Sequence, residues 1–468
     1  MQQLLDLGLP KPDVAALSDV APRQRFSDPA FQDNKITSIH RWVPWIAGFS
    51  ANFVRDMISH YLPNGARQCT ILEPFAGVGT TLVEGLIGGH EVIGFEVNPF
   101  AYLASRVKCN AHELSTNRID AALTGFRSSC LPRIAAIEAA MDSGVDPADV
   151  LPAPLSKRPK NFKSRVPFFS PIVELKVLHC LDAIKEIGDA PVRDLFLLAL
   201  GSLLVNASNY SYEPSLGSRV AAGRLPVLDD DVSGKLVTKI LGMRDDIALY
   251  RAAIGMFSHA PSAVVYNETS LELHNRVDAH SVDLVVTSPP YLNNYHYIRN
   301  TRPQLYWLDC VADSADLKTI ENASFGKFWQ TVREQPPMQL DFDHPGLTAL
   351  ITEVAQRNPG RGAYSGQGWA NYAVQYFNDS YKMCAQLKYV LRPGAHAVFV
   401  LGNSIVQGVE IPVDRIFGEI GQLHGLELAD IHMLRTKRVG NSTVKSAARY
   451  GLGGGAALYE TAVVLRQP

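Results

Sequence analysis

The feature that most constrains the fold is a stretch between residues 69 and 99 that reads as strand, turn, helix and strand. The apolar segment CTILEP is followed by the turn AGVG and then by TTLVEGLIGG, whose apolar residues suit a helix. A second apolar segment, EVIGFEV, ends in Asn-Pro. This alternation opens a parallel sheet with helices on both faces. We therefore expect an α/β fold with a doubly wound, mostly parallel sheet.

The rest of the chain divides into a continuation of the sheet and a helical middle. Strand patterns return at SAVVYNE and VDLVVTSPPY; a helix, a Pro-Gly turn and the strand AHAVFVLGN follow, and ETAVVLRQ ends an expected antiparallel hairpin. Residues 111–260 contain four segments with helical periodicity. We expect residues 36–110 and 261–468 to form the sheet domain and 111–260 to be a largely helical insertion.

Two further segments have less regular patterns. Residues 1–35 contain prolines and little periodicity, so we expect an arm on the surface. Residues 36–64 predict a turn and an amphipathic helix with Phe49, Phe53 and Met57 on one face. Residues 309–370 are rich in Pro and Gly and predict ordered loops around the substrate.

Composition is that of an ordinary globular protein, with 46% hydrophobic and 19% charged residues. The six cysteines form no C-x-x-C pair and no cluster with histidine, so we expect no metal site and a reducing, cytoplasmic setting. No apolar run has the length of a membrane span, and the N-terminus does not have the pattern of a signal peptide.

The turn after the first strand has the residues of a nucleotide-type binding loop. Gly77 and Gly79 let the backbone bend and approach a ligand, and the following helix presents N–H groups to an anion. Leu82 stands where a dinucleotide fingerprint would have a third glycine, which disfavours NAD. Glu96, at the end of the next strand, can accept hydrogen bonds from both hydroxyls of a ribose. The alternative is a tight turn of an unrelated α/β fold.

A second constellation, Thr287-Ser288-Pro289-Pro290-Tyr291, directly follows the apolar segment VDLVV. Two prolines fix the backbone and remove two N–H donors, so carbonyls and the Ser288 hydroxyl remain as acceptors. Such a turn suits a planar base with an amino group: Ser288 Oγ and the Pro289 carbonyl accept the amine hydrogens, and Tyr291 stacks on the ring. A turn that merely closes a strand is the alternative.

Together these motifs resemble the DNA amino-methyltransferases, which act on cytosine N4 or adenine N6. LEPFAGVGTT is similar to their cofactor motif, GFEVNP to their acidic strand end and TSPPY to their catalytic motif. SIHRWVPWIAGFSANFV looks like the motif that precedes the cofactor loop in members with this motif order. The resemblance implies a class I fold with a seven-stranded sheet, and double-stranded DNA as substrate.

The same resemblance implies S-adenosylmethionine as cofactor. Its methionine end would lie near Phe49 and Ser50 and near the glycine turn, its ribose on Glu96, and its adenine near Asn98 and Glu268, although Asn267 stands where the family more often has glycine. The full expected cofactor site is Phe49, Ser50, Glu73, Pro74, Phe75, Gly77, Gly79, Thr80, Thr81, Glu96, Asn98 and Glu268. The expected catalytic residues are Ser288, Pro289, Pro290 and Tyr291.

The chemistry of the target follows from the same residues. An exocyclic amine is a poor nucleophile, and hydrogen bonds from its protons make the nitrogen more nucleophilic, while in-line placement lowers the barrier. Methylation at cytosine C5 would need a cysteine after proline, and the chain has no Pro-Cys. Within the family, Ser before Pro-Pro-Tyr favours cytosine N4, with adenine N6 as the alternative. The base must leave the duplex to reach the site.

The sequence does not single out one segment as the one that contacts DNA. Basic residues gather in 157–165 and among Arg435, Lys437, Arg438, Lys445 and Arg449; either run would hold phosphates or be a solvated loop. The insertion 111–260 and the segment 309–370 are both candidates to cover a groove. Asn293 and Asn294 would read the base edge or cap a turn, whereas His296 is expected to be packed or exposed.

Two rival functions remain open at this point. One is an RNA base amino-methyltransferase, although such enzymes often have an N-terminal RNA-binding domain and only about 35 residues precede the motif region here. The other is an inactive, DNA-binding subunit of a modification complex, which the intact Gly77, Gly79, Glu96 and Ser288 disfavour. A restriction or defence-system protein is a further expected partner.

Overall fold

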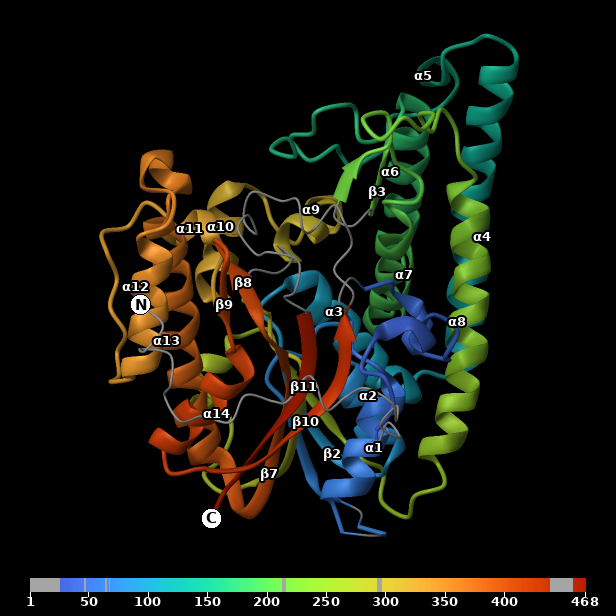
Figure 1. The fold of residues 1–468 in the computed structure, drawn as a ribbon. Helices are drawn as coiled ribbons and strands as arrows, with labels where there is room; N and C mark the ends of the chain where they lie inside the picture. Colours follow the sequence, from blue (N-terminus) through green and yellow to red (C-terminus); the bar gives the residue numbers. More distant parts are fainter. Residues whose placement is uncertain are drawn as a thin grey trace, which may run out of the picture.

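A seven-stranded sheet forms the centre of the protein (Figure 1). The computed structural model describes residues 26–45, 48–63, 65–66, 68–212, 216–292, 297–437 and 458–468. In the order β10-β11-β7-β6-β1-β2-β5, the strands are Glu427–Lys437, Leu458–Arg466, Leu391–Gly402, Val282–Thr287, Thr70–Glu73, Glu91–Phe95 and Ala263–Tyr266. Strand β11 runs antiparallel to both of its neighbours, and the other pairings are parallel. This topology confirms the predicted class I methyltransferase fold and its closing hairpin.

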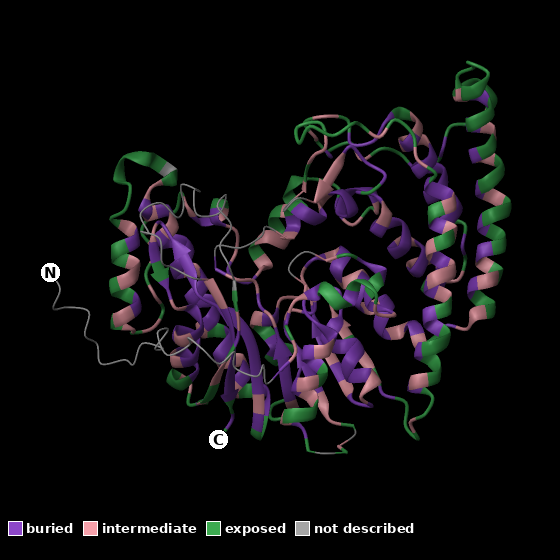
Figure 2. Ribbon diagram, turned by 45° about the vertical axis from the view of Figure 1, so that its right-hand side comes forward, coloured by how far each residue is buried: buried purple, intermediate pink, exposed green. Residues whose placement is uncertain are grey.

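Helices cover both faces of the sheet. Alternate residues of β6 point to opposite faces: Leu284 and Val286 pack with α1, α2 and α3, and Val285 packs with α13 and α14. Figure 2 shows the sheet as the buried layer between these helices. The helices are α1 Ala51–Tyr61, α2 Thr80–Ile87, α3 Pro99–Asn110, α13 Gly366–Val390 and α14 Val413–Leu423.

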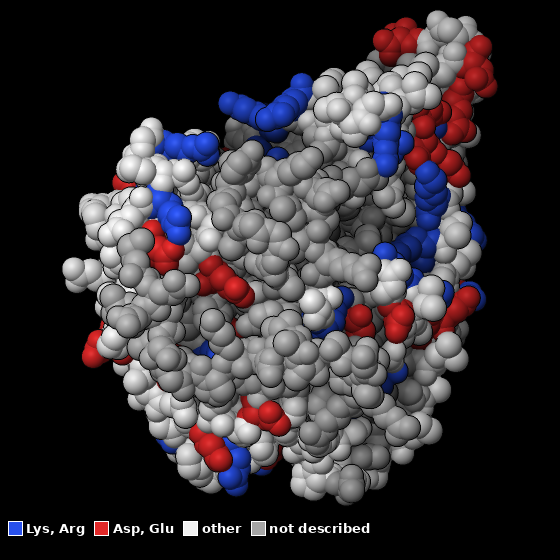
Figure 3. Space-filling view, viewed as in Figure 1, with Lys and Arg blue, Asp and Glu red and all other residues white. Residues whose placement is uncertain are grey.

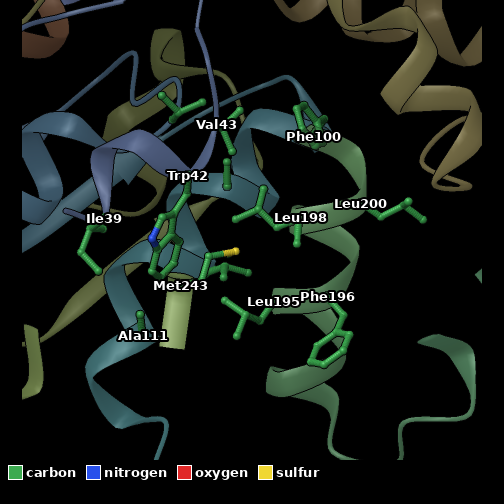
Figure 4. Close-up of a cluster of buried hydrophobic side chains, with 14 of the residues drawn as sticks. Ile39, Trp42, Val43, Phe100, Ala111, Leu195, Phe196, Leu198, Leu200 and Met243 are labelled. Atoms are coloured by element: carbon green, nitrogen blue, oxygen red, sulfur yellow. The ribbon is translucent and has the colours of Figure 1, made fainter. Parts of the chain in front are cut away.

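The middle of the chain is largely helical, as predicted, and lies beside the sheet rather than apart from it (Figure 1). Its elements are α4 Thr116–Asp142, α5 Pro147–Val150, α6 Pro171–Lys185, α7 Ala190–Leu203, α8 Val232–Ile254 and a hairpin of β3 Tyr210–Tyr212 and β4 Leu216–Ser218. Figure 4 shows Leu195 and Leu198 of α7 and Met243 of α8 in one cluster with Trp42 and Phe100. The insertion therefore shares its core with the sheet domain.

A buried carboxylate fixes the segment before α1 to the insertion. Asp246 of α8 accepts hydrogen bonds from Ile39 N at 3.2 Å, Arg41 Nη2 at 2.7 Å and Trp42 Nε1 at 2.9 Å. These bonds hold the 3₁₀ helix η3, His40–Trp42, and thereby the chain that leads to the site. The described part of the predicted arm, 26–35, also packs inward, with Phe31 and Asn34 buried.

The prediction of loops for residues 309–370 is wrong. This segment contains α10 Ser314–Ala323, α11 Trp329–Val332 and α12 Pro345–Ala355, after α9 Tyr297–Trp307. These helices have eleven residues or fewer, and α10 buries none of its residues fully, with only Leu317 and Ile320 packed partly against the core. Short helices of this kind give a weak periodic signal. The remaining short elements are η2 Phe31–Lys35, η4 Ala111–Glu113, η5 Ser270–Asn275, η6 Pro359–Tyr364, β8 Ser404–Val406 and β9 Val409–Ile411. In the part of the chain that the structure describes, no helix is both long enough and apolar enough to cross a membrane.

Candidate functional site

The site lies where the strand order reverses. The chain passes from β1 outward to β2 and β5 and later returns to β6 on the other side of β1, so the connections after β1 and β6 leave in opposite directions. A crevice at the carboxyl ends of the strands is the usual ligand site of such a sheet. The glycine turn follows β1 and the Pro-Pro turn follows β6, so both predicted motifs meet at this crevice.

The glycine turn has the backbone that its sequence requires. Gly77 has φ +50° and Gly79 has φ +84°, which are left-handed conformations that favour glycine. Gly79 is the N-cap of α2, and a Cβ there would lie 3.0 Å from the Ser105 Cα. Gly79 therefore serves both the turn and the close approach of α2 to α3.

Glu73 connects the two motifs. Its Oε1 accepts hydrogen bonds from Phe75 N at 2.9 Å and from the Thr287 hydroxyl, the residue directly before Ser288. Its Oε2 lies 2.8 Å from Thr81 Oγ1, which is also 3.2 Å from the Val286 carbonyl oxygen. The Thr81 hydroxyl has one proton for two acceptors, so a protonated Glu73 that donates to Thr81 would satisfy all the groups. Burial raises the pKa of Glu73 to about 7, which agrees with this proton count.

Glu96 holds the turn from the next strand. Its two carboxylate oxygens accept hydrogen bonds from Gly77 N at 2.7 Å and Asn98 N at 2.8 Å. Burial raises the pKa of Glu96 to about 7, against the lowering effect of these backbone N–H groups. Each oxygen keeps a further lone pair, so the carboxylate can still accept hydrogen bonds from two hydroxyls.

The Pro-Pro turn brings Ser288 and Tyr291 together. The two side chains are hydrogen-bonded to each other. Burial and the nearby Glu460 raise the pKa of Tyr291 above its ordinary value, so its phenol is neutral. Pro289 is buried, whereas Ser288 and Pro290 on either side of it in the chain are partly exposed.

Both turns line one cavity, whose empty volume is about 1320 Å³ including the part open to solvent. Ten of the predicted cofactor residues line it, namely Phe49, Glu73, Pro74, Phe75, Gly77, Thr80, Thr81, Glu96, Asn98 and Glu268. Ser288, Pro290 and Tyr291 line the same cavity.

Three of the predicted residues do not line the cavity, and two that do line it have side chains already bonded to other residues. Pro289, Ser50 and Gly79 do not line the cavity; Ser50 is the N-cap of α1 and accepts from Phe53 N. The Asn98 side chain caps α3 and donates to Thr301 Oγ1 at 2.7 Å. Glu268 is paired with Arg276, which lowers its pKa. The two caps are local, because Ser50 and Asn98 accept from backbone N–H groups two or three residues later in their own helices, as their position before a helix allows. The contact of Asn98 with Thr301 depends on the folded structure.

The cavity has walls that the sequence reasoning missed. Trp45 and Tyr297, which are far apart in the sequence, both line the cavity. Their rings are nearly parallel, with centroids 6.4 Å apart. Residues 323–328, between α10 and α11, form another wall, in which Phe325 packs edge-on against Phe75 and Tyr376. Aromatic residues near a motif are a weak signal alone, since most of them are core residues.

Other predicted residues lie elsewhere. Asn293, Asn294 and His296, together with Arg438, Lys445 and Arg449, fall outside the described residues. Arg435 is paired with Glu460 and Asp28, so its charge is already partly balanced. Among the described residues, no group of three or more His, Cys, Asp or Glu side chains has the arrangement of a metal site.

The strand order and the site at the switch point define the class of the protein: a class I methyltransferase fold. No family model matches the chain. Curated proteins that match it include the type II methyltransferases M.MvaI of Kocuria varians, M.BsoBI of Geobacillus stearothermophilus and M.AvaI of Nostoc sp. (strain PCC 7120 / SAG 25.82 / UTEX 2576). They are 23%, 23% and 22% identical over 75%, 90% and 94% of this chain, and over 73%, 85% and 88% of their own lengths. The family resemblance is thus confirmed: the chain is related to type II methyltransferases.

The solved structures that match include the rRNA methyltransferase aviRa from Streptomyces viridochromogenes. It is 10% identical, covers 96% of each chain and has a TM-score of 0.30. A TM-score this low supports no conclusion about the function of the present chain.

Proposed function

We propose that the protein is a DNA methyltransferase that transfers a methyl group from S-adenosylmethionine to the exocyclic amine of a base turned out of the duplex, with cytosine N4 as the target atom. The observation that carries the proposal is the single cavity lined by both Gly77 and Ser288. It supports a two-substrate site, with a cofactor end at the glycine turn and an acceptor end at the Pro-Pro turn. The type II names of its relatives support a role in a restriction-modification system.

The residues of the cavity fit S-adenosylmethionine. Glu96 keeps acceptor capacity for two ribose hydroxyls, and Phe49 and Phe75 offer apolar walls. When bound, the cofactor supplies an electrophilic methyl group on a sulfonium centre. The turn at Gly77, held by Glu96, would fix the position of the donor end.

The acceptor end would act on the amine. Ser288 Oγ accepts one amine hydrogen, which concentrates the lone pair on the nitrogen, and the ring of Tyr291 lies against the base. In the transfer, the N–CH₃ bond forms as the S–CH₃ bond breaks, and the nitrogen then loses one proton to solvent. Glu73 and Thr287 would hold the Ser288 turn at a fixed distance from the glycine turn.

Methyl transfer to nucleic acid tests the proposal. The protein is incubated with S-adenosylmethionine carrying a tritiated methyl group and with duplex DNA or with RNA, and the labelled product is digested to nucleosides. We expect label in DNA that co-migrates with N4-methylcytosine. Label in N6-methyladenine would overturn the choice of base, label in RNA alone would overturn the substrate, and no label would overturn the activity.

A further inference from the structure

A basic surface extends from the wall of the cavity over part of the insertion. It comprises residues 150–173, the segments 205–212 and 216–228 around the β3–β4 hairpin, and residues 297–308, which include α9. These ranges include nine Lys or Arg and no Asp or Glu, in a chain whose net charge is −2. Asp149, Glu174, Asp229 and Asp309 lie directly beside the ranges, and Glu174 pairs with Arg158. Such a separation of charge on a near-neutral protein indicates an anionic partner.

The parts of the basic surface are held together as one unit. Tyr210 Oη accepts a hydrogen bond from Arg165 N at 3.0 Å, which joins the 150–173 loop to the hairpin. The hairpin is in turn bound to α9, since Tyr212 Oη donates to the Asn300 carbonyl at 3.0 Å and Leu216 N donates to Asn300 Oδ1 at 3.0 Å. Phe162 packs against Tyr306 of α9, with ring centroids 5.6 Å apart.

Three cations of the 150–173 loop form no ion pair within the part of the protein that the structure describes. Lys160, Lys163 and Arg165 are exposed, and none of them forms an ion pair with another residue that the structure describes. In Figure 3, Lys and Arg side chains project over this loop at the upper edge of the molecule, while acidic side chains gather at the neighbouring tip of α4 and α5. These three charges are therefore available to a partner.

The position of the basic surface relates it to the cavity. Tyr297 and Ile298, in the first turn of α9, line the cavity, so the surface starts where a base would enter. Helix α9 contributes two of the nine cations, Arg299 and Arg302, so positive charge continues from the loop to the wall of the cavity.

The other candidate for covering DNA has the opposite charge. Residues 309–370 include eight Asp or Glu and five Lys or Arg, and Arg357 and Arg333 are paired with acidic neighbours. An excess of negative charge repels a phosphate backbone. The electrostatics therefore favour the basic surface, with its 150–173 loop, hairpin and α9, over this segment.

We infer that the basic surface is the phosphate grip of the protein, which holds the duplex backbone beside the base that enters the cavity. The inference rests on the proposed DNA substrate and adds which part of the chain binds it. Phosphate contacts position a duplex without reading its sequence, so this surface sets affinity and its dependence on salt.

The test is the salt dependence of duplex binding. Lys160→Gln, Lys163→Gln and Arg165→Gln are combined in one variant, and a matched control combines Lys318→Gln, Arg357→Gln and Arg361→Gln, which removes the same charge from the 309–370 segment. Binding of a fluorescent duplex is measured by anisotropy between 50 and 200 mM salt. The melting temperature and the affinity for S-adenosylmethionine are measured for each variant.

For the first variant we expect affinity about tenfold or more weaker for every duplex sequence, and a slope of log K against log salt that is smaller by about 0.9 for each phosphate that the variant no longer neutralises. Cofactor affinity and melting temperature should be unchanged, and the control should bind nearly as wild type. Equal weakening in both variants, or an unchanged slope in the first, overturns the inference. If the wild type methylates DNA in either of those cases, the proposed function still stands; if it methylates only RNA or nothing, both fall.

Discussion

Replacement of Glu73 by glutamine tests the proton that we place between the two motifs. Glutamine can keep every hydrogen bond of the protonated acid: its Oε1 accepts from Phe75 N and the Thr287 hydroxyl, and its Nε2 donates to Thr81 Oγ1, which then donates to the Val286 carbonyl. Unlike the acid, glutamine has no charge to bury at any pH. The variant is thus a permanent form of the protonated state.

The magnitude follows from the raised pKa. A rise from 4.5 to about 7 corresponds to roughly 3 kcal/mol against the ionised carboxylate in the folded protein. Below pH 4.5 the acid is protonated in both the folded and the unfolded state, so no penalty exists. As the pH rises from 4.5 to 7 the unfolded state loses its proton first and stability falls, and above pH 7 the full penalty is present. Glu73→Gln should therefore be more stable than wild type at pH 8, by up to about 3 kcal/mol, and nearly equal at pH 4.5.

Urea unfolding at a series of pH values between 4.5 and 8.5 measures this difference. Glu84→Gln is the control with the opposite sign: although burial acts to raise the Glu84 pKa, hydrogen bonds and charges from His40 and Arg55 lower it overall, so that variant should lose stability at pH 8. If Glu73→Gln is less stable than wild type at pH 8, or if the difference in stability does not change with pH, the conclusion that folded Glu73 is protonated is wrong.

Three further predictions concern single residues. Ser288→Ala should slow methyl transfer about tenfold or more in single-turnover assays, while calorimetry finds cofactor affinity near normal; abolished cofactor binding would contradict its role. Glu96→Gln should weaken cofactor binding by about 10- to 100-fold, because the amide turns an N–H toward the donors Gly77 N or Asn98 N; equal affinity would contradict the ribose assignment. Gly79→Ala should cost about 1–3 kcal/mol in urea unfolding, since φ is +84° and the new Cβ meets the Ser105 backbone at 3.0 Å; a neutral effect would exclude that strain.

The fold was predictable where local pattern and tertiary structure agree. In the segment 69–99, the apolar runs form the strands, and the glycines allow the backbone conformation of the turn. Strand, turn and helix therefore followed from the sequence alone. The same is true of the strand before Ser288. In contrast, α12 lies in a segment rich in Pro and Gly, and the prediction of loops overlooked the helical spacing of its apolar residues Leu347, Leu350, Ile351 and Val354. Helix α10 is short, and only its Leu317 and Ile320 pack partly against the core.

The site was predictable as two motifs but not as a cavity. The contact of Glu73 with Thr287 spans 214 positions, and it depends on the parallel pairing of β1 with β6. The wall residues Trp45, Tyr297 and Phe325 come from separate segments of the chain, and no spacing rule connects them. Likewise, Asn98 has the residue type of a ligand, but the fold uses its side chain as a helix cap.

The central claim is that the glycine turn and the Pro-Pro turn enclose one site for donor and acceptor. A crystal structure with a non-transferable analogue of S-adenosylmethionine tests it most directly. We predict that the analogue lies in the cavity with its ribose hydroxyls on Glu96 and its reactive end toward Ser288. An analogue bound outside this cavity, or one with its reactive end away from Ser288, would contradict the claim.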